Sequence, residues 1–88
     1  MSYVYILRST RNGKYYIGST TGVQRRFLQH QRGNVYSTIR LFPVELAFSQ
    51  QFANLGEARE IERRLKKFKR HDIVARIIEN GKIELQGP

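Results

Sequence analysis

Five side chains of this 88-residue chain are candidates for proton transfer or for binding a charged group at one site, and they are spread along its length. They are two tyrosines, an arginine, a histidine and a glutamate, namely Tyr5, Tyr16, Arg26, His30 and Glu62. The sequence has no glycine-rich phosphate loop, no clustered pair of carboxylates and no His/Cys array with metal-ligand spacing. Any chemistry therefore depends on whether the fold brings these scattered side chains together.

The two tyrosines lie on a predicted β-hairpin. Residues 3–8 and 14–18 are rich in Tyr, Val, Ile and Leu, which suit a half-buried strand. Asn12-Gly13 between these runs predicts a type I′ turn, because both residues tolerate the positive φ that this turn requires. A turn centred there pairs position 9 with 16 and position 5 with 20. Tyr5 and Tyr16 then share one face of the sheet with Leu7 and Gly18, and the other face takes Val4, Ile6, Tyr15 and Ile17.

Arg26 and His30 lie on a predicted helix that follows the hairpin. Thr20 or Thr21 is its expected N-cap, and the helix runs to about position 32. At about 100° per residue, Arg26 and His30 fall side by side along one edge of the apolar face. They either reach a shared ligand or decorate an exposed helix edge. The apolar face itself carries Val23 and Phe27.

Glu62 interrupts the apolar face of a later predicted helix, which Asn54 can cap. The apolar stripe is spaced by three or four residues and consists of Leu55, Ala58, Ile61, Leu65 and Phe68. On a helical wheel of about 100° per residue, Glu62 falls between Leu55 and Ala58, inside this stripe. A carboxylate there must find a cation, a metal ion or hydrogen-bond donors, or else become protonated. Glu62 is therefore either part of a site or the structural partner of a nearby Lys or Arg.

The remaining predicted elements are a third strand and a last helix. Val44, Leu46 and Phe48 alternate with polar or small residues, which predicts a strand that can extend to Phe52. Asp72 is expected to cap the last helix, and Asn80-Gly81 to end it. Residues 34–43 show no period and are expected to form a loop or short helical turn that contains Tyr36, Ser37, Thr38 and Arg40.

Charge and composition limit the partners of the chain. Sixteen Lys and Arg against seven Asp and Glu give a formal net charge of +9, and the pI is about 10.5. This charge attracts polyanions, and nucleic acid is the expected partner because no basic amphipathic membrane anchor stands out. The absence of cysteine excludes disulfide partners and thiolate metal sites. With no secretory signal pattern and no apolar run of membrane-spanning length, we expect a cytoplasmic location.

Two tyrosine motifs carry a resemblance to a known family. Tyr3-Val4-Tyr5 followed by Tyr16-Ile17-Gly18 resembles the paired signature of the GIY-YIG nucleases. Arg26 and His30 follow at the matching spacing, and the segment from Glu57-Ala58 to Lys67 around Glu62 is similar to the metal helix of the small stand-alone members. The resemblance covers residues 3 to about 78. It implies a single domain over residues 1–88 with an α/β (α+β) fold, in which helices flank a three-stranded antiparallel or mixed sheet.

The resemblance also implies a role for each of the five residues. Glu62 would hold a single divalent cation, Mg²⁺ or Mn²⁺, and Arg26 would grip the scissile phosphate and stabilise charge in the transition state. Tyr5 would accept a proton from the attacking water, with Tyr16 and His30 positioning that water or sharing the proton. A free phenol titrates near 10, so this role requires positive charge nearby.

The sequence departs from the family pattern at two places. The opening Gly-Ile-Tyr of the family is Tyr-Val-Tyr here, which keeps the reacting phenol and changes its neighbour. Asn80 is the candidate for the late site asparagine of the family, but its place before Gly81 fits a helix stop equally well. Phosphate contacts outside the site are expected from basic residues that otherwise form a solvated charged surface: Lys14, Arg25, Arg40, Lys66 and Lys67.

By the resemblance, these features predict a metal-dependent endonuclease that hydrolyses DNA phosphodiester bonds. By the resemblance, cleavage leaves 5′-phosphate and 3′-hydroxyl ends. A surface this small favours recognition of structure, such as single strands, flaps or branches, over recognition of sequence. The alternatives are a non-catalytic nucleic-acid-binding module with the same fold and a basic accessory protein of a ribonucleoprotein. The last explains the charge but not the ordered Tyr, Tyr, Arg, His and Glu set, and the oligomeric state stays open.

Overall fold

A computed structural model describes residues 1–32, 43–68 and 71–83, which form a three-stranded antiparallel sheet with helices on both faces. The order of elements is β1 (Ser2–Ser9), β2 (Tyr15–Thr20), α1 (Val23–Gln31), β3 (Val44–Phe52), α2 (Leu55–Phe68) and α3 (His71–Asn80). Strand β1 lies between β2 and β3, so β2 forms one edge of the sheet. The predicted fold class is confirmed, and the sheet is purely antiparallel in the described residues.

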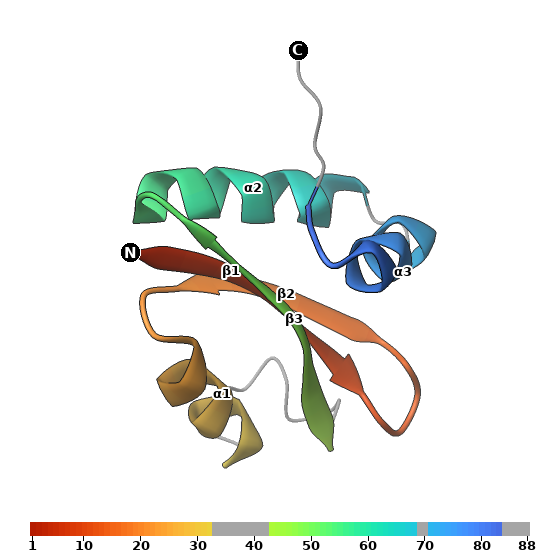
Figure 1. Ribbon diagram of the computed structural model, residues 1–88. Coiled ribbons are helices and arrows are strands. Elements are labelled where there is room, and N and C mark those ends of the chain that lie inside the picture. Colours follow the sequence, from red (N-terminus) through yellow and green to blue (C-terminus); the bar gives the residue numbers. More distant parts are fainter. Residues whose placement is uncertain (33–42, 69–70, 84–88) are drawn as a thin grey trace.

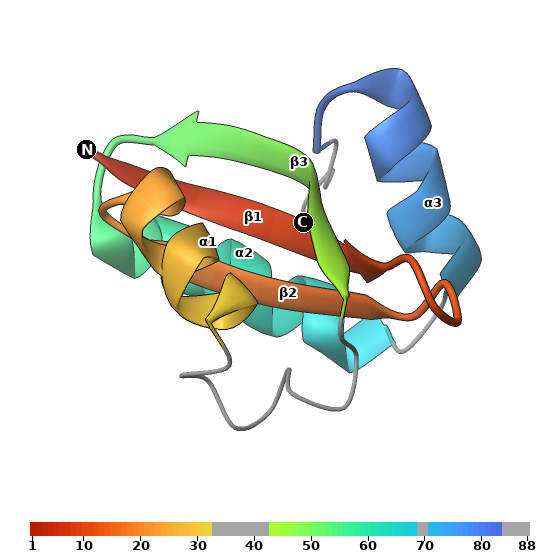
Figure 2. The same ribbon diagram turned by 90° about the horizontal axis from the view of Figure 1, so that it is seen from below.

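The helices divide the sheet into two faces, with α2 on one side and α1 on the other (Figures 1 and 2). The face towards α2 and α3 packs the larger apolar cluster, which includes Val4, Ile6, Ile17, Phe48, Ala58, Leu65, Val74 and Ile77. The face towards α1 packs a smaller cluster of Tyr5, Leu7 and Val44, bordered by Tyr16, Val23 and Phe27. We call these the α2 face and the α1 face. Both predicted hairpin faces are thereby confirmed.

The hairpin keeps these faces although its register differs from the prediction. Tyr5 pairs with Gly18 and Leu7 with Tyr16, a shift of two positions from the predicted pairing. The predicted two-residue turn is wrong, because Ser9 N donates to Lys14 O at 2.8 Å and residues 10–13 form a wider loop between them. A shift of two residues leaves the alternation of side chains unchanged. The face on which the tyrosines lie is therefore independent of the turn.

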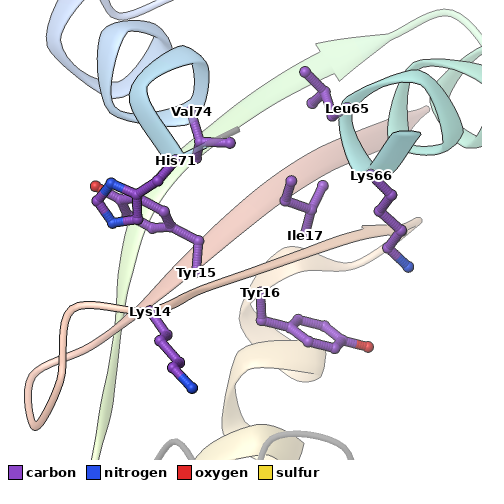
Figure 3. A pocket seen from close by; sticks show the side chains of 8 residues that line it. All are labelled: Lys14, Tyr15, Tyr16, Ile17, Leu65, Lys66, His71 and Val74. Carbon is purple, nitrogen blue, oxygen red and sulfur yellow. The ribbon is translucent and has the colours of Figure 1, made fainter. Parts of the chain in front are cut away.

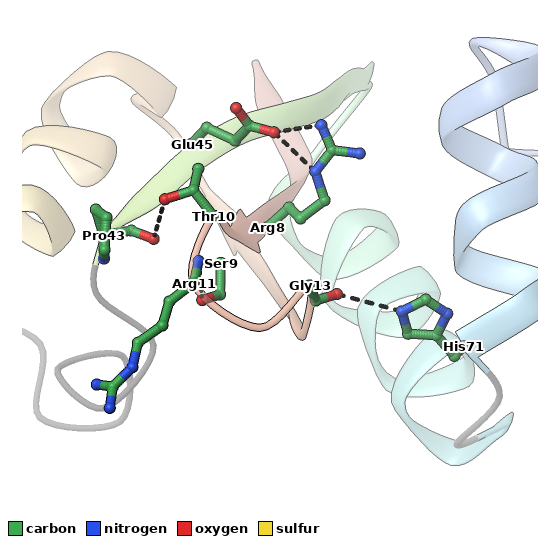
Figure 4. Close-up of polar contacts among 8 residues, drawn as sticks. All are labelled: Arg8, Ser9, Thr10, Arg11, Gly13, Pro43, Glu45 and His71. Atoms are coloured by element: carbon green, nitrogen blue, oxygen red, sulfur yellow. Dashed lines mark hydrogen bonds and ion pairs between the residues drawn. The ribbon is translucent and has the colours of Figure 1, made fainter.

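Polar contacts hold this loop in place (Figure 4). Ser9 Oγ accepts hydrogen bonds from the backbone N–H groups of Arg11 and Asn12 at 3.2 and 3.3 Å. Gly13 has a φ of +76°, which few residues with a side chain adopt. The loop also connects to the segment before β3, because Thr10 N donates to Pro43 O at 2.9 Å.

Strand β3 confirms the longer predicted strand, but its apolar residues do not share one face. Ile6 pairs with Phe48 whereas Leu7 pairs with Leu46, so Ala47 is an extra residue at a β-bulge. The extra residue reverses the alternation. Val44 consequently packs on the α1 face and Phe48 on the α2 face, which corrects the predicted single apolar face.

The predicted cap of the first helix is wrong. Strand β2 continues through Thr20, and the N-cap of α1 is Gly22, which makes no side-chain cap bond. Thr20 Oγ1 instead accepts a hydrogen bond from Gly22 N at 3.1 Å and tightens the turn that leads into the helix. The predicted cap of α2 is confirmed, since Asn54 Oδ1 accepts from Glu57 N at 2.8 Å.

The last helix begins one residue before its predicted cap. Asp72 lies in the first turn of α3, which starts at His71. The predicted stop is confirmed, because Gly81 has a φ of +78° and its N–H donates to Ile77 O at 2.9 Å. Residues 34–42 of the predicted loop over 34–43, with Arg40, lie outside the described residues. None of the described helices is both long enough and apolar enough to span a bilayer.

Candidate active site at the edge of strand β2

Tyr5 and His30 form the buried centre of a side-chain cluster on the α1 face. The Tyr5 hydroxyl lies 2.9 Å from His30 Nε2, and the two residues are only 2% and 0% exposed. Tyr16 completes the cluster, with its ring centroid 5.0 Å from that of His30 and 6.4 Å from that of Tyr5. The fold therefore brings three of the five candidate residues together. For His30, the alternative of an exposed helix edge is wrong.

Burial controls the protonation of this cluster. Burial and the nearby Arg26 guanidinium lower the pKa of His30 to about 4, so the imidazole is neutral at pH 7. Burial also raises the pKa of Tyr5 above its usual value of 10, and the hydrogen bond with Arg26 opposes that shift without cancelling it. The phenol is therefore protonated at pH 7 and can donate to Nε2 when His30 carries its proton on Nδ1. Arg26 alone does not make Tyr5 a base at neutral pH.

Arg26 extends the cluster towards a polar cavity of about 410 Å³. The oxygens of Tyr5 and Tyr16 raise the pKa of Arg26, and its Nη1 donates to Gln29 Oε1 at 2.8 Å. Arg25 and Arg59 line the same cavity. Three guanidinium groups around one cavity favour an anion with several acceptor oxygens, such as a phosphate group.

Glu62 lies on the α2 face, across β2 from the tyrosine cluster. Ser19, which shares this face with Ile17, donates from Oγ to Glu62 Oε1 at 2.5 Å. Lys66 Nζ donates to Glu62 Oε2 at 2.6 Å. The Glu62 side chain remains 20% exposed. The carboxylate has thus found both a donor and a cation, and it stays accessible at the edge of the sheet.

Lys66 connects the two halves of the site. Its Nζ lies 5.8 Å from the centroid of the Tyr16 ring as well as beside Glu62. Since β2 is the edge strand, no other described strand stands between Glu62 and the tyrosines, and the charge of Glu62 contributes to the raised pKa of Tyr5. The five candidate residues consequently flank one strand edge, four on the α1 face and Glu62 on the α2 face.

Gly18 makes room for the Tyr5 ring. The two residues pair directly in the register of β1 and β2. A Cβ atom built at position 18 would lie 2.4 Å from the Tyr5 hydroxyl oxygen and 2.5 Å from Cζ. Space, rather than an unusual φ, therefore requires glycine as the third residue of the Tyr16-Ile17-Gly18 motif.

Two side chains of the site were absent from the predicted set. Ser19 was detectable from strand alternation, which places it on the face of Ile17 and hence towards α2. Arg59 precedes Glu62 by three positions on α2 and so lies on a neighbouring part of the helix surface. Of the expected phosphate contacts, Arg25 lines the polar cavity, whereas Lys67 is exposed on α2 and lines neither that cavity nor the one described below.

The surroundings of Glu62 fit a single hard cation. Across the described residues, no three His, Cys, Asp or Glu side chains gather as a multi-ligand metal site. Glu62 and the Ser19 hydroxyl offer oxygen ligands at a partly exposed edge, where water and phosphate oxygens can complete the shell that Mg²⁺ prefers. The Lys66 ammonium group already pairs with Oε2, so a cation at Glu62 would take over the position that Lys66 holds.

Comparison with known proteins identifies the family. The profile of the GIY-YIG catalytic domain matches residues 1–74. The chain belongs to this family. The resemblance of the two tyrosine motifs is thereby confirmed, and GIY-YIG membership implies a nuclease-type function with nucleic acid as the substrate.

The curated relatives carry a common family name. A UPF0213 protein of Streptococcus pneumoniae is 44% identical over 71 residues, which cover 78% of this chain and 70% of the relative. A UPF0213 protein of Halobacterium salinarum is 37% identical over 71 residues, which cover 80% of this chain and 91% of the relative. No solved structure matches the chain. The printed names of these relatives specify no activity.

The buried His30 predicts a loss of stability on acidification. Its folded-state pKa of about 4 lies below the ordinary 6.5, so between these values the unfolded chain binds a proton that the folded protein excludes. The neutral, buried His30 makes its full contribution to the free energy of unfolding above pH 6.5. About 3 kcal/mol of this contribution is lost as the pH falls to 4. Urea unfolding at several pH values between 7 and 4 measures the slope of the free energy of unfolding against pH. His30→Gln should flatten it, and equal slopes in the two proteins would contradict the assignment.

Proposed function

We propose that this protein hydrolyses phosphodiester bonds in nucleic acid, DNA in particular, with one divalent cation held by Glu62. The observation that carries the proposal is the shared edge of β2, which has the hydrogen-bonded Tyr5 and His30 pair with Tyr16 and Arg26 on one side and Glu62 on the other. A phosphate group at this edge meets arginine from the polar cavity and phenol from the α1 face. This combination supplies charge stabilisation and proton transfer at one phosphorus centre.

Three side chains of the site then have separate tasks. Arg26 binds the scissile phosphate and stabilises the charge that develops on its oxygens. Tyr5 accepts the proton of the attacking water and hydrogen-bonds through the same oxygen to His30. Since a histidine with a pKa of about 4 is a weak base, His30 serves as a positioning residue for the phenol. A divalent cation held by Glu62 would supply Lewis-acid stabilisation of phosphate charge and positive charge that would favour ionisation of nearby phenols.

The reaction balances as a hydrolysis. The water oxygen forms a new bond to phosphorus, and the bond from phosphorus to the 3′ oxygen breaks. Tyr5 acts in its ionised form, after its own proton has passed to solvent; the phenolate oxygen then takes one proton of the water, and the leaving 3′ oxygen takes a proton from solvent to become a hydroxyl. The products are a 5′-phosphate and a 3′-hydroxyl. Backbone charge and nucleic-acid structure guide substrate choice in the cytoplasm, because so small a surface offers few contacts to base edges.

Metal dependence tests the proposal. End-labelled single-stranded, duplex and branched DNA, with matched RNA, are incubated with the protein in Mg²⁺, in Mn²⁺ and in EDTA. We expect cleavage in either metal, no cleavage in EDTA, and products that DNA ligase rejoins because they carry 5′-phosphates. Cleavage that persists in EDTA would contradict the cation at Glu62. Binding without cleavage of any substrate would favour the non-catalytic module.

A further inference from the structure

A second cavity, of about 380 Å³, opens at the other end of β2 (Figure 3). Strand β2, helix α2 and helix α3 all contribute side chains to it. Tyr16 and Lys66 line this cavity and also belong to the candidate active site. A group bound in the cavity is therefore adjacent to the edge at which Glu62 lies.

One wall of the cavity consists of two aromatic rings in contact. The ring centroids of Tyr15 and His71 lie 4.5 Å apart, with 33° between the ring planes. His71 Nε2 lies 3.2 Å from Gly13 O, so the hairpin loop fixes the imidazole when Nε2 carries the proton (Figure 4). The His71 side chain is otherwise exposed. The fold thus holds an aromatic surface at the rim of the cavity without burying it.

The rest of the cavity combines apolar and cationic groups. Ile17, Leu65 and Val74 line it with aliphatic side chains, and Lys14 and Lys66 bring two ammonium groups to it (Figure 3). An exposed aromatic ring next to aliphatic groups suits the face of a nucleobase, and the ammonium groups suit the phosphates on either side of that base. A base paired within a duplex cannot enter a cavity of this kind without leaving its stack.

We propose that this cavity binds the base of an unpaired nucleotide a few nucleotides along the strand from the scissile phosphate, against the aromatic wall of Tyr15 and His71. The reference to a scissile phosphate rests on the proposed function, whereas binding of the base does not require cleavage. The nucleic-acid strand then follows the edge of β2 from the arginine-lined polar cavity, past Glu62, to the aromatic wall. At about 3.3 Å per residue the edge from Tyr15 to Thr20 is roughly 17 Å long, which is several phosphate spacings. The cavity thereby selects single strands or locally unpaired regions.

The test compares two strands with the same charge. Fluorescence anisotropy in EDTA measures the affinity for an eight-nucleotide thymidine strand and for an eight-unit strand of abasic tetrahydrofuran phosphates. We expect the protein to bind the thymidine strand about tenfold more tightly or better, since base stacking on aromatic side chains is sequence-tolerant and strong. Equal affinity for the two strands would overturn the proposal.

Variants assign the difference to the aromatic wall. His71→Ala should bring the affinity for the thymidine strand close to that for the abasic strand, and should leave the abasic affinity unchanged. His71→Phe keeps a ring but loses the hydrogen bond to Gly13 O, so it should retain the preference for bases. Lys14→Ala removes a charge at the same cavity, so it should weaken the binding of both strands to the same extent. A base preference that survives His71→Ala would overturn the assignment.

The same measurements separate this inference from the proposed function. Base-dependent binding that His71→Ala removes, in a protein that cleaves nothing in any metal, supports the cavity and contradicts the nuclease mechanism. Metal-dependent cleavage by a protein that binds both strands equally supports the mechanism and overturns the cavity.

Discussion

Glu62→Ala is expected to lower the rate of metal-dependent cleavage by at least about a thousandfold, because it removes the carboxylate that holds the cation. Lewis-acid stabilisation of the transition state contributes several kcal/mol, and each 1.4 kcal/mol is about tenfold in rate. The fold should survive, since Glu62 is partly exposed and water can replace it as the partner of Ser19 and Lys66. Single-turnover cleavage in Mg²⁺ measures the rate, and a thermal melt checks the fold.

Glu60→Ala is the matched control for this variant. Glu60 lies on the same helix and makes surface ion pairs with Arg63 and Arg64 at 2.6 and 3.3 Å. The substitution changes the net charge equally but leaves the edge of β2 untouched, so the rate should stay within about threefold of the unmodified protein. Activity at the original level in Glu62→Ala, or an equal loss of activity in Glu60→Ala, would contradict the assignment of the cation to Glu62.

Arg26→Ala tests the phosphate-binding half of the same site. Loss of a positively charged donor to the developing oxyanion is expected to lower the rate by about a hundred- to a thousandfold. Nucleic-acid binding should weaken much less, because Arg25 and Arg59 remain at the polar cavity. Arg76→Ala on α3 removes the same charge at an exposed position and serves as the control.

The sequence correctly predicted on which face of the hairpin each side chain lies, but not the turn or the strand register. Side-chain alternation has a period of two, so the shift of two residues caused by the wider loop kept Tyr5 and Tyr16 together. The same alternation failed in β3, where one extra residue at Ala47 reversed it. No residue type at that position signals the bulge. A register shift of two residues therefore leaves the predicted faces correct, whereas a shift of one residue makes them wrong.

The arrangement of the site depended on packing that the pattern does not encode. Helical periodicity placed Arg26 beside His30, but the burial of His30 against Tyr5 follows from how α1 docks on the sheet. Periodicity likewise found Glu62 inside an apolar stripe without showing that its helix covers the opposite face from the tyrosines. The two halves meet because β2 is an edge strand, which is a property of strand order.

Gly18→Ala is expected to destabilise the protein by about 3 kcal/mol and to reduce cleavage at least about a hundredfold. The added methyl group would lie 2.4 Å from the Tyr5 hydroxyl oxygen, and the ring cannot move aside freely because it is 2% exposed and hydrogen-bonded to His30. A displacement of the phenol by about 1 Å suffices for a loss of this size in catalysis. Urea unfolding and single-turnover cleavage measure the two effects.

Two further variants test whether the steric clash between the new methyl group and the Tyr5 ring causes the loss of stability. Gly22→Ala makes the same substitution where the nearest atom, in the flexible side chain of Arg25, is 3.4 Å away, so it should cost less than about 1 kcal/mol. In a Tyr5→Leu background the three atoms closest to the new Cβ are gone, and Gly18→Ala should then cost at least about 1 kcal/mol less than in the unmodified protein. If the cost were the same in both backgrounds, backbone effects rather than the Tyr5 ring would explain the glycine. A smaller cost would mean that Gly18 is needed because the reacting phenol lies directly across it.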